Sequence, residues 1–425
     1  MKNLIRIKGC SLVYLTTLVL LLSACRQISG TVEPVVHTNT PATNTPAANT
    51  GTPTNFPTIE PSPITAPATT EVSAGQVTPQ ATPSGSGNHV GWLKTDSAIL
   101  RTTDGGESWV DVTPSAIREA LSTAGNGGSG DFEAAFSQAD YALAAYAMGN
   151  EAWIFRTSDG GQSWEESRLA LQEEVQGITS MVLADEAHGW LLATRGVGAG
   201  NDWVDLYHTE DGGANWGFLA GSESEKNPAG GISSGGIKSG LSFSSPQKGW
   251  LTGSAPIDLV YLFRTLDGGL SWQPYHQPLP EGASFSNSSY PPIFFDENQG
   301  ILPAVLITLS NEPGLLFYET QDGGETWVPI VLLEGEITAW DWVDLQHGFA
   351  SGTDEQQQSK LFVTSDGGNS WEAYPVEMPV VRSLDFITDQ VGWAVCGWAF
   401  DPREGCSGDV YHTKDRGRSW ERVYP

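Results

Sequence analysis

The stretch Thr364-Ser365-Asp366-Gly367-Gly368-Asn369-Ser370-Trp371 decides the fold, because it is one member of a repeated set. Five further copies lie at 102–109, 157–164, 209–216, 265–272 and 320–327, and a degraded seventh lies at 413–420, where Arg416 replaces the first glycine. The aspartates of the seven copies are Asp104, Asp159, Asp211, Asp267, Asp322, Asp366 and Asp415, between 44 and 56 residues apart. One turn motif at a period of this size is typical of a propeller or a solenoid.

The segments between the copies predict four short strands in each unit. Around the third copy these are 178–183, 189–194, 204–208 and 216–219, with turn residues between them. A Gly-Trp or Gly-Phe pair at the second strand, as at Gly189-Trp190, marks the unit independently of the octapeptide. The pattern predicts an all-β protein, a seven-bladed β-propeller with four-stranded antiparallel blades.

The first unit departs from this pattern. No convincing first strand precedes Asn88, so either the preceding segment supplies one near Thr70–Val77 or the first blade has three strands. The stretch from Ser115 to Leu121 is an insertion that predicts a helical turn between the first two blades.

The octapeptide itself is interpreted as a turn that closes a hairpin. Its aspartate can accept backbone N–H groups, its two glycines permit positive φ, and its tryptophan can pack under the loop. Seven copies at equivalent places cannot all form one active site, so we assign them a structural role.

The N-terminus predicts export and lipid attachment. Lys2, Arg6 and Lys8 precede an apolar run that is too short to span a bilayer, which is typical of a signal peptide. The run ends in Leu-Ser-Ala-Cys25, which looks like a bacterial lipobox, so residues 1–24 would be removed and Cys25 would carry the lipid; an ordinary secretory peptide is the alternative. We therefore expect a protein held by lipid at the extracytoplasmic face of a cell membrane.

Residues 25–87 are rich in Thr and Pro and almost free of aromatic residues, which predicts a disordered tether before a propeller at 88–425. Of the four cysteines, Cys10 leaves with the signal peptide and Cys25 takes the lipid. Cys396 and Cys406 then predict a disulfide, since an exported protein lies in an oxidising compartment. A two-cysteine metal site lacks nearby histidines.

Charge excludes one class of partner. Acidic residues outnumber basic residues 50 to 21 and the formal net charge is -29. Nucleic acid is therefore not an expected partner, because phosphate binding needs clustered Lys and Arg.

The octapeptide resembles the Asp-box, or BNR, repeat. With its Gly-Trp pair the unit is most similar to the photosystem II stability and assembly factor family, a resemblance that covers about 88–425. It implies a propeller whose boxes lie on outer turns, in a family whose members are exported and sometimes lipid-anchored. The chain shows no cluster of arginines that could form a basic docking patch.

Candidate catalytic residues are few. Arg101, Arg156 and Arg264 precede boxes at equivalent places and so do not predict the converging arginines of a sialidase. A glycoside hydrolase needs two opposed carboxylates. The candidates are Asp131, Glu336, Asp341 and Asp385, but the sequence indicates no pairing among them. No histidine pattern or glycine loop predicts a metal or a cofactor.

For binding, the mouth of the central channel is the usual propeller site. Candidates there are Glu173, Glu174, Lys238, Tyr290, Trp340, Asp341 and Arg382. We predict a non-catalytic binding or assembly module with a protein or glycan ligand; the alternative is an extracytoplasmic carbohydrate-active enzyme or glycan binder.

Overall fold

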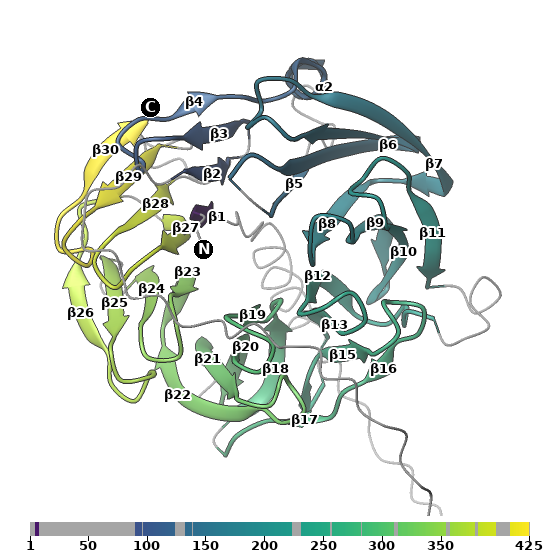
Figure 1. The fold of residues 1–425 in the computed structure, drawn as a ribbon. Coiled ribbons are helices and arrows are strands. Elements are labelled where there is room, and N and C mark those ends of the chain that lie inside the picture. Colours follow the sequence, from purple (N-terminus) through teal and green to yellow (C-terminus); the bar gives the residue numbers. More distant parts are fainter. Residues whose placement is uncertain are drawn as a thin grey trace, which may run out of the picture. The chain divides into compact units, whose positions relative to one another are not determined.

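The computed structural model describes residues 5–7, 90–95, 97–123, 132–137, 139–222, 231–255, 257–281, 283–309, 313–353, 358–378, 381–396 and 409–424. The chain divides into two compact units, residues 1–12 with 87–425 and residues 13–86. The first unit is a ring of seven sheets whose neighbouring strands are mostly antiparallel. The predicted seven-bladed β-propeller is therefore confirmed (Figure 1). The predicted tether and Cys25 lie outside the described residues.

Each blade is one sheet whose strands follow in chain order from the channel outward. Blade one holds β1 (Ile5–Ile7), β2 (Gly91–Lys94), β3 (Ile99–Thr102) and β4 (Val110–Asp111). Blade two holds β5 (Glu133–Phe136), β6 (Ala142–Thr157) and β7 (Glu165–Val175). Blade three holds β8 (Gly177–Leu183), β9 (Gly189–Gly198), β10 (Asn201–Thr209) and β11 (Gly217–Gly221). Blade four holds β12 (Ile237–Phe243), β13 (Gly249–Ser254), β15 (Leu262–Thr265) and β16 (Gln273–Pro274), with the added pair β14 (Leu259–Val260) and β17 (Gln277–Pro278).

The last three blades follow the same order. Blade five holds β18 (Ala283–Ser289), β19 (Ile293–Phe294), β20 (Gly300–Thr308), β21 (Pro313–Thr320) and β22 (Val328–Glu334). Blade six holds β23 (Glu336–Trp342), β24 (Gly348–Thr353), β25 (Ser359–Thr364) and β26 (Glu372–Pro375). Blade seven holds β27 (Val381–Phe386), β28 (Gly392–Cys396), β29 (Val410–Thr413) and β30 (Glu421–Tyr424).

Blade two has four strands although its sheet contains three elements. The rings of Tyr146 and Trp153, both on β6, stack with their centroids 4.9 Å apart. Seven residues of straight strand would separate them by about 23 Å. β6 therefore folds back on itself, and Gly149 with φ of 66° supplies the turn.

Blade one differs from the expectation. Its innermost strand is β1, which pairs parallel to β2, with Ile5 opposite Gly91 and Ile7 opposite Leu93. The other inner strands are antiparallel to their neighbours. Blade one therefore has four strands, the innermost of them from a segment that the sequence did not point to. Thr70–Val77, the other predicted source of a strand, lies outside the described residues.

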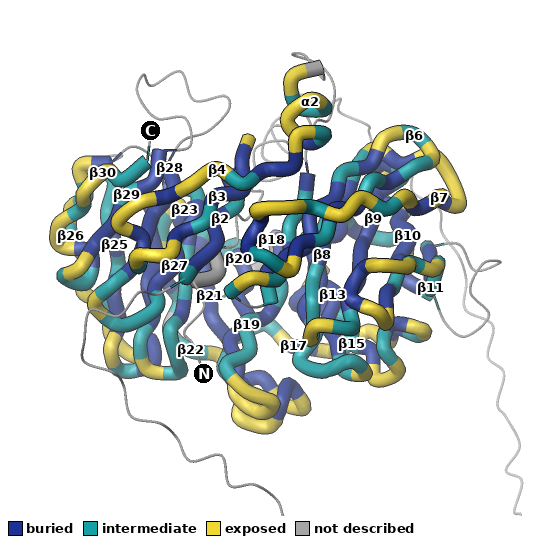
Figure 2. The backbone as a smooth tube through the Cα atoms, turned by 45° about the horizontal axis from the view of Figure 1, so that its top comes forward, coloured by how far each residue is buried: buried dark blue, intermediate teal, exposed yellow. Residues whose placement is uncertain are grey.

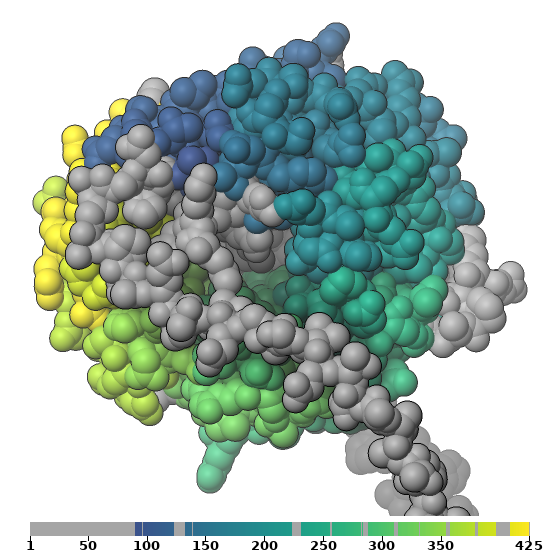
Figure 3. All heavy atoms as spheres, viewed as in Figure 1, coloured from purple at the N-terminus to yellow at the C-terminus, as the bar shows by residue number. Residues whose placement is uncertain are grey.

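Tryptophans of the Gly-Trp pairs, which four of the blades carry, contact the next blade. Trp190 is fully buried and its indole N–H donates to the Gly268 carbonyl of the next blade's box at 2.8 Å. Trp393 of blade seven packs edge-on against Trp109 of blade one, with ring centroids 6.2 Å apart. Glu107 and Lys414 form an ion pair across the same junction. The first and last blades are thus side by side and the ring is closed (Figure 3).

The two ends of the blades carry different connections. In blade three the N–H of Gly212, in the box, donates to the Ala187 carbonyl in the turn between the first two strands, at 2.8 Å. We call this side, with the boxes and the first turns, the turn face. Because neighbouring strands are antiparallel, the links between second and third strands lie at the opposite end, which we call the hairpin face.

The insertion after blade one is the helix α2 (Ser115–Thr123), as predicted, and it is the one helix among the described residues. No helix in that part of the chain is long and apolar enough to cross a membrane. Buried residues run through the blades while exposed residues concentrate in α2 and the turns (Figure 2).

Candidate binding site

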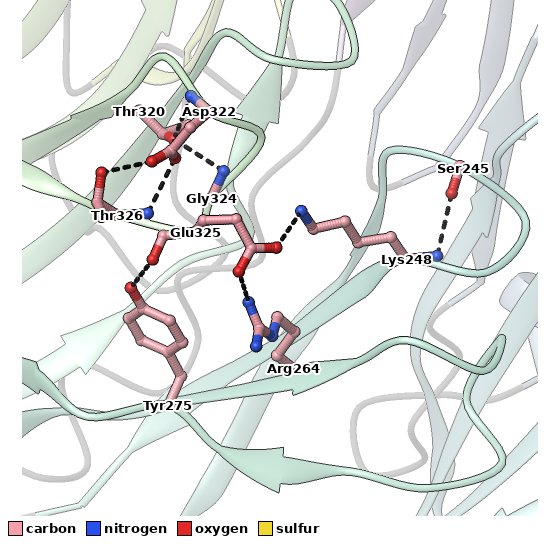
Figure 4. A network of polar contacts seen from close by, with 9 residues as sticks. All are labelled: Ser245, Lys248, Arg264, Tyr275, Thr320, Asp322, Gly324, Glu325 and Thr326. Carbon is pink, nitrogen blue, oxygen red and sulfur yellow. Dashed lines mark hydrogen bonds and ion pairs between the residues drawn. The ribbon is translucent and has the colours of Figure 1, made fainter. Parts of the chain in front are cut away.

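The boxes are hydrogen-bonded turns whose aspartates are fully engaged. In the fifth box, Thr320 donates its O–H to Asp322 Oδ1 at 2.8 Å and accepts the Gly324 N–H at 2.8 Å. Asp322 accepts the backbone N–H of Thr326 at 2.9 Å and its O–H at 2.7 Å (Figure 4). Burial raises the pKa of Asp322, but these bonds outweigh it and hold the pKa at about 2. A carboxylate held this way supports a turn and is not available for acid–base chemistry near neutral pH.

The degraded seventh box keeps the same geometry. Arg416 takes φ of 68°, in the left-handed region that a glycine occupies in the other copies. Thr413 still accepts the Gly417 N–H at 2.9 Å, and Asp415 still accepts the Ser419 N–H at 2.9 Å. The turn therefore tolerates the loss of one glycine.

The arginines that precede boxes have separate acidic partners. Arg264 and Lys248 of blade four both bind the carboxylate of Glu325 in the fifth box, at 2.7 and 2.9 Å (Figure 4). Arg101 pairs with Asp140 of blade two, whereas Arg156 pairs with Glu165 within its own blade. Each arginine has an acidic partner of its own, so the three do not converge on one carboxylate ligand.

Hydrogen bonds between inner strands fix the wall of the central channel. Ser239 on β12 donates its O–H to the Ser289 carbonyl on β18 at 2.7 Å. Asp341 on β23 accepts the Phe386 N–H of β27 at 2.6 Å. Asp341, a predicted ligand-binding residue, therefore holds blades six and seven together.

Two predicted aromatic residues come together although they are 50 residues apart. Tyr290 and Trp340 meet nearly edge to face, with ring centroids 4.7 Å apart. Tyr290 is buried, whereas Trp340 is half-buried. Trp340 is thus the member of the pair that a ligand could reach. Arg382 is half-buried on β27.

Lys238 does not reach solvent. It is 1% exposed, and its ammonium donates to the carbonyls of Asp202, Gly235 and Gly236 at 3.3, 3.1 and 2.9 Å. Burial lowers its pKa to about 8. The prediction that Lys238 would bind a ligand is corrected, because its three donors are occupied inside the fold.

The candidate carboxylates for hydrolysis occupy unlike environments. Glu336 is exposed at the start of β23, Asp385 is 6% exposed on β27, and Asp341 bonds to the backbone of the next blade. Asp131 lies outside the described residues. Among the residues that the structure describes, no three His, Cys, Asp or Glu side chains gather to hold a metal ion.

The histidines serve repeated structural roles. His188 and His347 each bond through Nδ1 to an aspartate three residues earlier, at 2.9 and 3.0 Å. His412 stacks on Trp393 at 4.7 Å, and burial lowers its pKa. Cys396 is disulfide-bonded; Cys406 lies outside the described residues, so the pairing of these two remains a prediction.

Two features were missed from the sequence. A cavity of about 380 Å³ lies between α2 and the second box, lined by residues that include Pro114, Arg118, Phe155 and Trp164. The insertion that breaks the repeat was the one signal for it. The second feature is a group of exposed apolar side chains on the hairpin face, Met148, Val197 and Trp203. Exposure of single apolar residues has no signature in a strand pattern.

Comparison with known proteins gives local sequence similarity and a shared fold. No protein-family model matches the chain. A segment of 133 residues, 31% of the chain, is 29% identical to the photosystem II assembly lipoprotein Ycf48 of Synechococcus sp. (strain CC9902), and the match spans 35% of that relative. The GH74 xyloglucanase of Xanthomonas campestris superimposes with a TM-score of 0.51 at 15% identity, over 77% of this chain and 50% of the enzyme. YCF48 from Cyanidioschyzon merolae aligns with a TM-score of 0.47 at 19% identity, over 72% of this chain and 88% of that one.

Proposed function

We propose that this protein is a lipid-anchored, extracytoplasmic propeller that binds another protein and takes part in the assembly of a membrane complex. The observation that carries the proposal is the 29% identity over 133 residues to a protein described as a photosystem II assembly lipoprotein. A seven-bladed propeller fits a binding module of this kind, because its loops present a broad rigid surface. Ordered turns and inter-blade bonds occupy the box aspartates, arginines that precede boxes and the turn histidines.

A glycan-processing role is less well supported. The similarity to the xyloglucanase extends to the fold alone, and fold does not imply function. Retaining or inverting hydrolysis needs two carboxyl groups free to face each other across a bond. The candidates on adjacent inner strands are Asp341 and Asp385. Asp341 accepts a backbone N–H, and Asp385 is buried.

The anchor is the first part of the proposal to test. Expression of the full chain and of Cys25→Ala in a bacterial host should give a membrane-bound and a released protein, respectively. Intact mass of the wild-type protein should show loss of residues 1–24 and addition of a diacylglycerol. This cleavage would also remove β1, so the first blade of the mature protein would keep β2, β3 and β4. A Cys25→Ala protein that stays in the membrane fraction, still unprocessed or bound in another way, would refute the lipid anchor.

The binding role is tested with the anchored protein in its native membranes. Chemical cross-linking followed by affinity purification should recover a defined membrane-protein partner in stoichiometric yield. An untagged strain controls for background, and the released Cys25→Ala variant controls for the contribution of the anchor. Recovery of the propeller without any cross-linked protein would contradict the proposal.

A further inference from the structure

We propose that the hairpin face of blades two and three docks a basic protein surface that has an apolar cleft, a proposal that rests on the binding function above. The docking patch consists of Met148, Glu173, Glu174 and Trp203. These residues lie at the turn of β6, on β7 near its end, and on the hairpin of β9 and β10. They belong to the connections that differ between blades, whereas the boxes repeat.

Two large apolar side chains of the patch are exposed to solvent. Met148 is 69% exposed and Trp203 is 38% exposed. Figure 2 shows the exposed backbone where β6 and β7 lie together. Tryptophan and methionine are among the residue types enriched at protein interfaces relative to other surfaces.

The segments that carry the patch adjoin each other across the two blades. Gly149, next to Met148, pairs with Val175 on β7. The following residue, Gln176, donates its N–H to the Thr194 carbonyl on β9 at 2.7 Å, and its side chain lies beside Gly196. Gly196 in turn pairs with Trp203. Met148 and Trp203 thus lie on neighbouring segments of blades two and three.

The buried Lys238 network holds the apolar hairpin in place. Thr194 donates its O–H to Asp202 Oδ1 at 2.7 Å, and the Lys238 N–H donates to Asp202 Oδ2 at 3.0 Å. The Lys238 ammonium also binds the Asp202 carbonyl. Asp202 immediately precedes Trp203, so the backbone that carries the exposed indole is fixed on both sides. A preformed anchor loses less conformational entropy when it binds.

Charge at the patch selects the partner. Glu173 and Glu174 are exposed, whereas Lys238 is buried and Arg195 has its Nε 3.7 Å from Asp205 Oδ2 with 11% of its side chain exposed. The exposed cation on β7, Arg168, pairs with Glu166. The patch therefore presents apolar groups beside negative charge. With a net charge of -29 on the chain, a partner with lysines or arginines around an apolar cleft would be attracted and oriented.

A site-specific photo-cross-linker tests the location of the patch. p-Benzoylphenylalanine is placed at Met148 or Trp203 in the full lipid-anchored chain, and at Leu266 or Leu270 as matched controls. The two leucines are 57% and 48% exposed but belong to the fourth box, on the turn face. We expect one protein adduct from positions 148 and 203 and none from the controls. Adducts only from the controls would overturn the proposed location of the patch but not the proposed binding function. No adduct at any position would count against the patch and against the binding function.

A defined probe tests the chemistry of the patch. The purified propeller is titrated with a soluble amphipathic peptide of alternating Leu and Lys pairs, followed by fluorescence anisotropy of a dye on the peptide. Trp203→Ala, and separately Glu173→Lys with Glu174→Lys, should each weaken binding about tenfold. Leu266→Ala should leave it unchanged, and 0.5 M NaCl should weaken the wild type. Equal weakening by Leu266→Ala, or no effect of the charge reversal, would overturn the proposal. Circular dichroism of each variant confirms that it is folded.

Discussion

The turn face and the hairpin face of the propeller are built from opposite ends of the same strands, yet they differ in how their residues are used. On the turn face, each box repeats the same set of hydrogen bonds from Thr and Asp to the backbone. On the hairpin face, the links differ in length and carry exposed apolar side chains such as Met148 and Trp203. Repetition on one face holds the ring together, and variation on the other leaves a surface for recognition.

Glycines in the boxes allow the largest test of this difference. Gly324 and Gly105 both have φ of 80°, but a Cβ on Gly324 would overlap the buried indole of Trp250, whereas a Cβ on Gly105 would meet nothing. Gly105→Ala should cost about 1 kcal/mol from backbone conformation alone. Gly324→Ala should cost about 3 kcal/mol, because overpacking adds to the conformational cost.

Urea unfolding of both variants measures this contrast. Equal losses of unfolding free energy would show that the packing beneath the box adjusts to an added methyl group. The turn face would then not be the rigid element of the ring.

Asp322→Ala should cost about 2 kcal/mol at pH 7, because Thr326 and the turn lose their acceptor. The folded pKa of Asp322 is about 2, below its ordinary value of 3.8. The stabilisation is therefore complete above about pH 4 and is lost as the pH falls through 2. The difference in unfolding free energy between wild type and Asp322→Asn should shrink over that window. A difference that does not change between pH 5 and pH 2 would exclude the carboxylate as the source.

The bridge across blades four and five should have a smaller effect. Hydrogen bonds from Lys248 and then Arg264 lower the pKa of Glu325. The Glu325 side chain is 53% exposed, so solvent screens the pair. Glu325→Gln should cost less than about 1 kcal/mol, and the loss should disappear in 1 M salt. Thermal unfolding at two salt concentrations measures it, and a loss that persists in salt would indicate packing in place of charge.

The sequence predicted the repeated parts well because they obey local rules. The Thr, Asp and Gly of each box satisfy backbone groups within eight residues, so the turn is legible without tertiary structure. The Gly-Trp pair was also recognisable in the sequence as a marker of strand two. The hydrogen-bond acceptor of its indole could not be predicted, because the Trp190 indole bonds to Gly268 in the next blade, 78 residues away.

The first blade shows where local rules end. In blades two to seven, a large apolar residue lies six residues before the start of strand two and ends the strand that precedes it. Phe243 before Gly249 and Phe386 before Gly392 are examples. The corresponding position before Gly91 is Gly85, which has no side chain to bury. The strand beside β2 instead comes from Ile5–Ile7, far away in the chain. The candidate site was more difficult to predict than the fold. Burial of Lys238 and exposure of Trp203 depend on neighbours outside their own strands.

Variants of the hairpin face should have the smallest effect on stability. Trp203→Ala should cost less than about 1 kcal/mol and Met148→Ala less than about 0.5 kcal/mol, since both side chains are already partly in water and neither closes a blade. Chemical denaturation beside Asp322→Ala measures the contrast under one set of conditions. A loss from Trp203→Ala as large as that from Asp322→Ala would mean that the indole supports the fold. If Trp203→Ala keeps its stability but no longer binds the Leu–Lys peptide, the two faces have separate roles. The repeated turns then supply folding energy, and the hairpins that differ supply recognition.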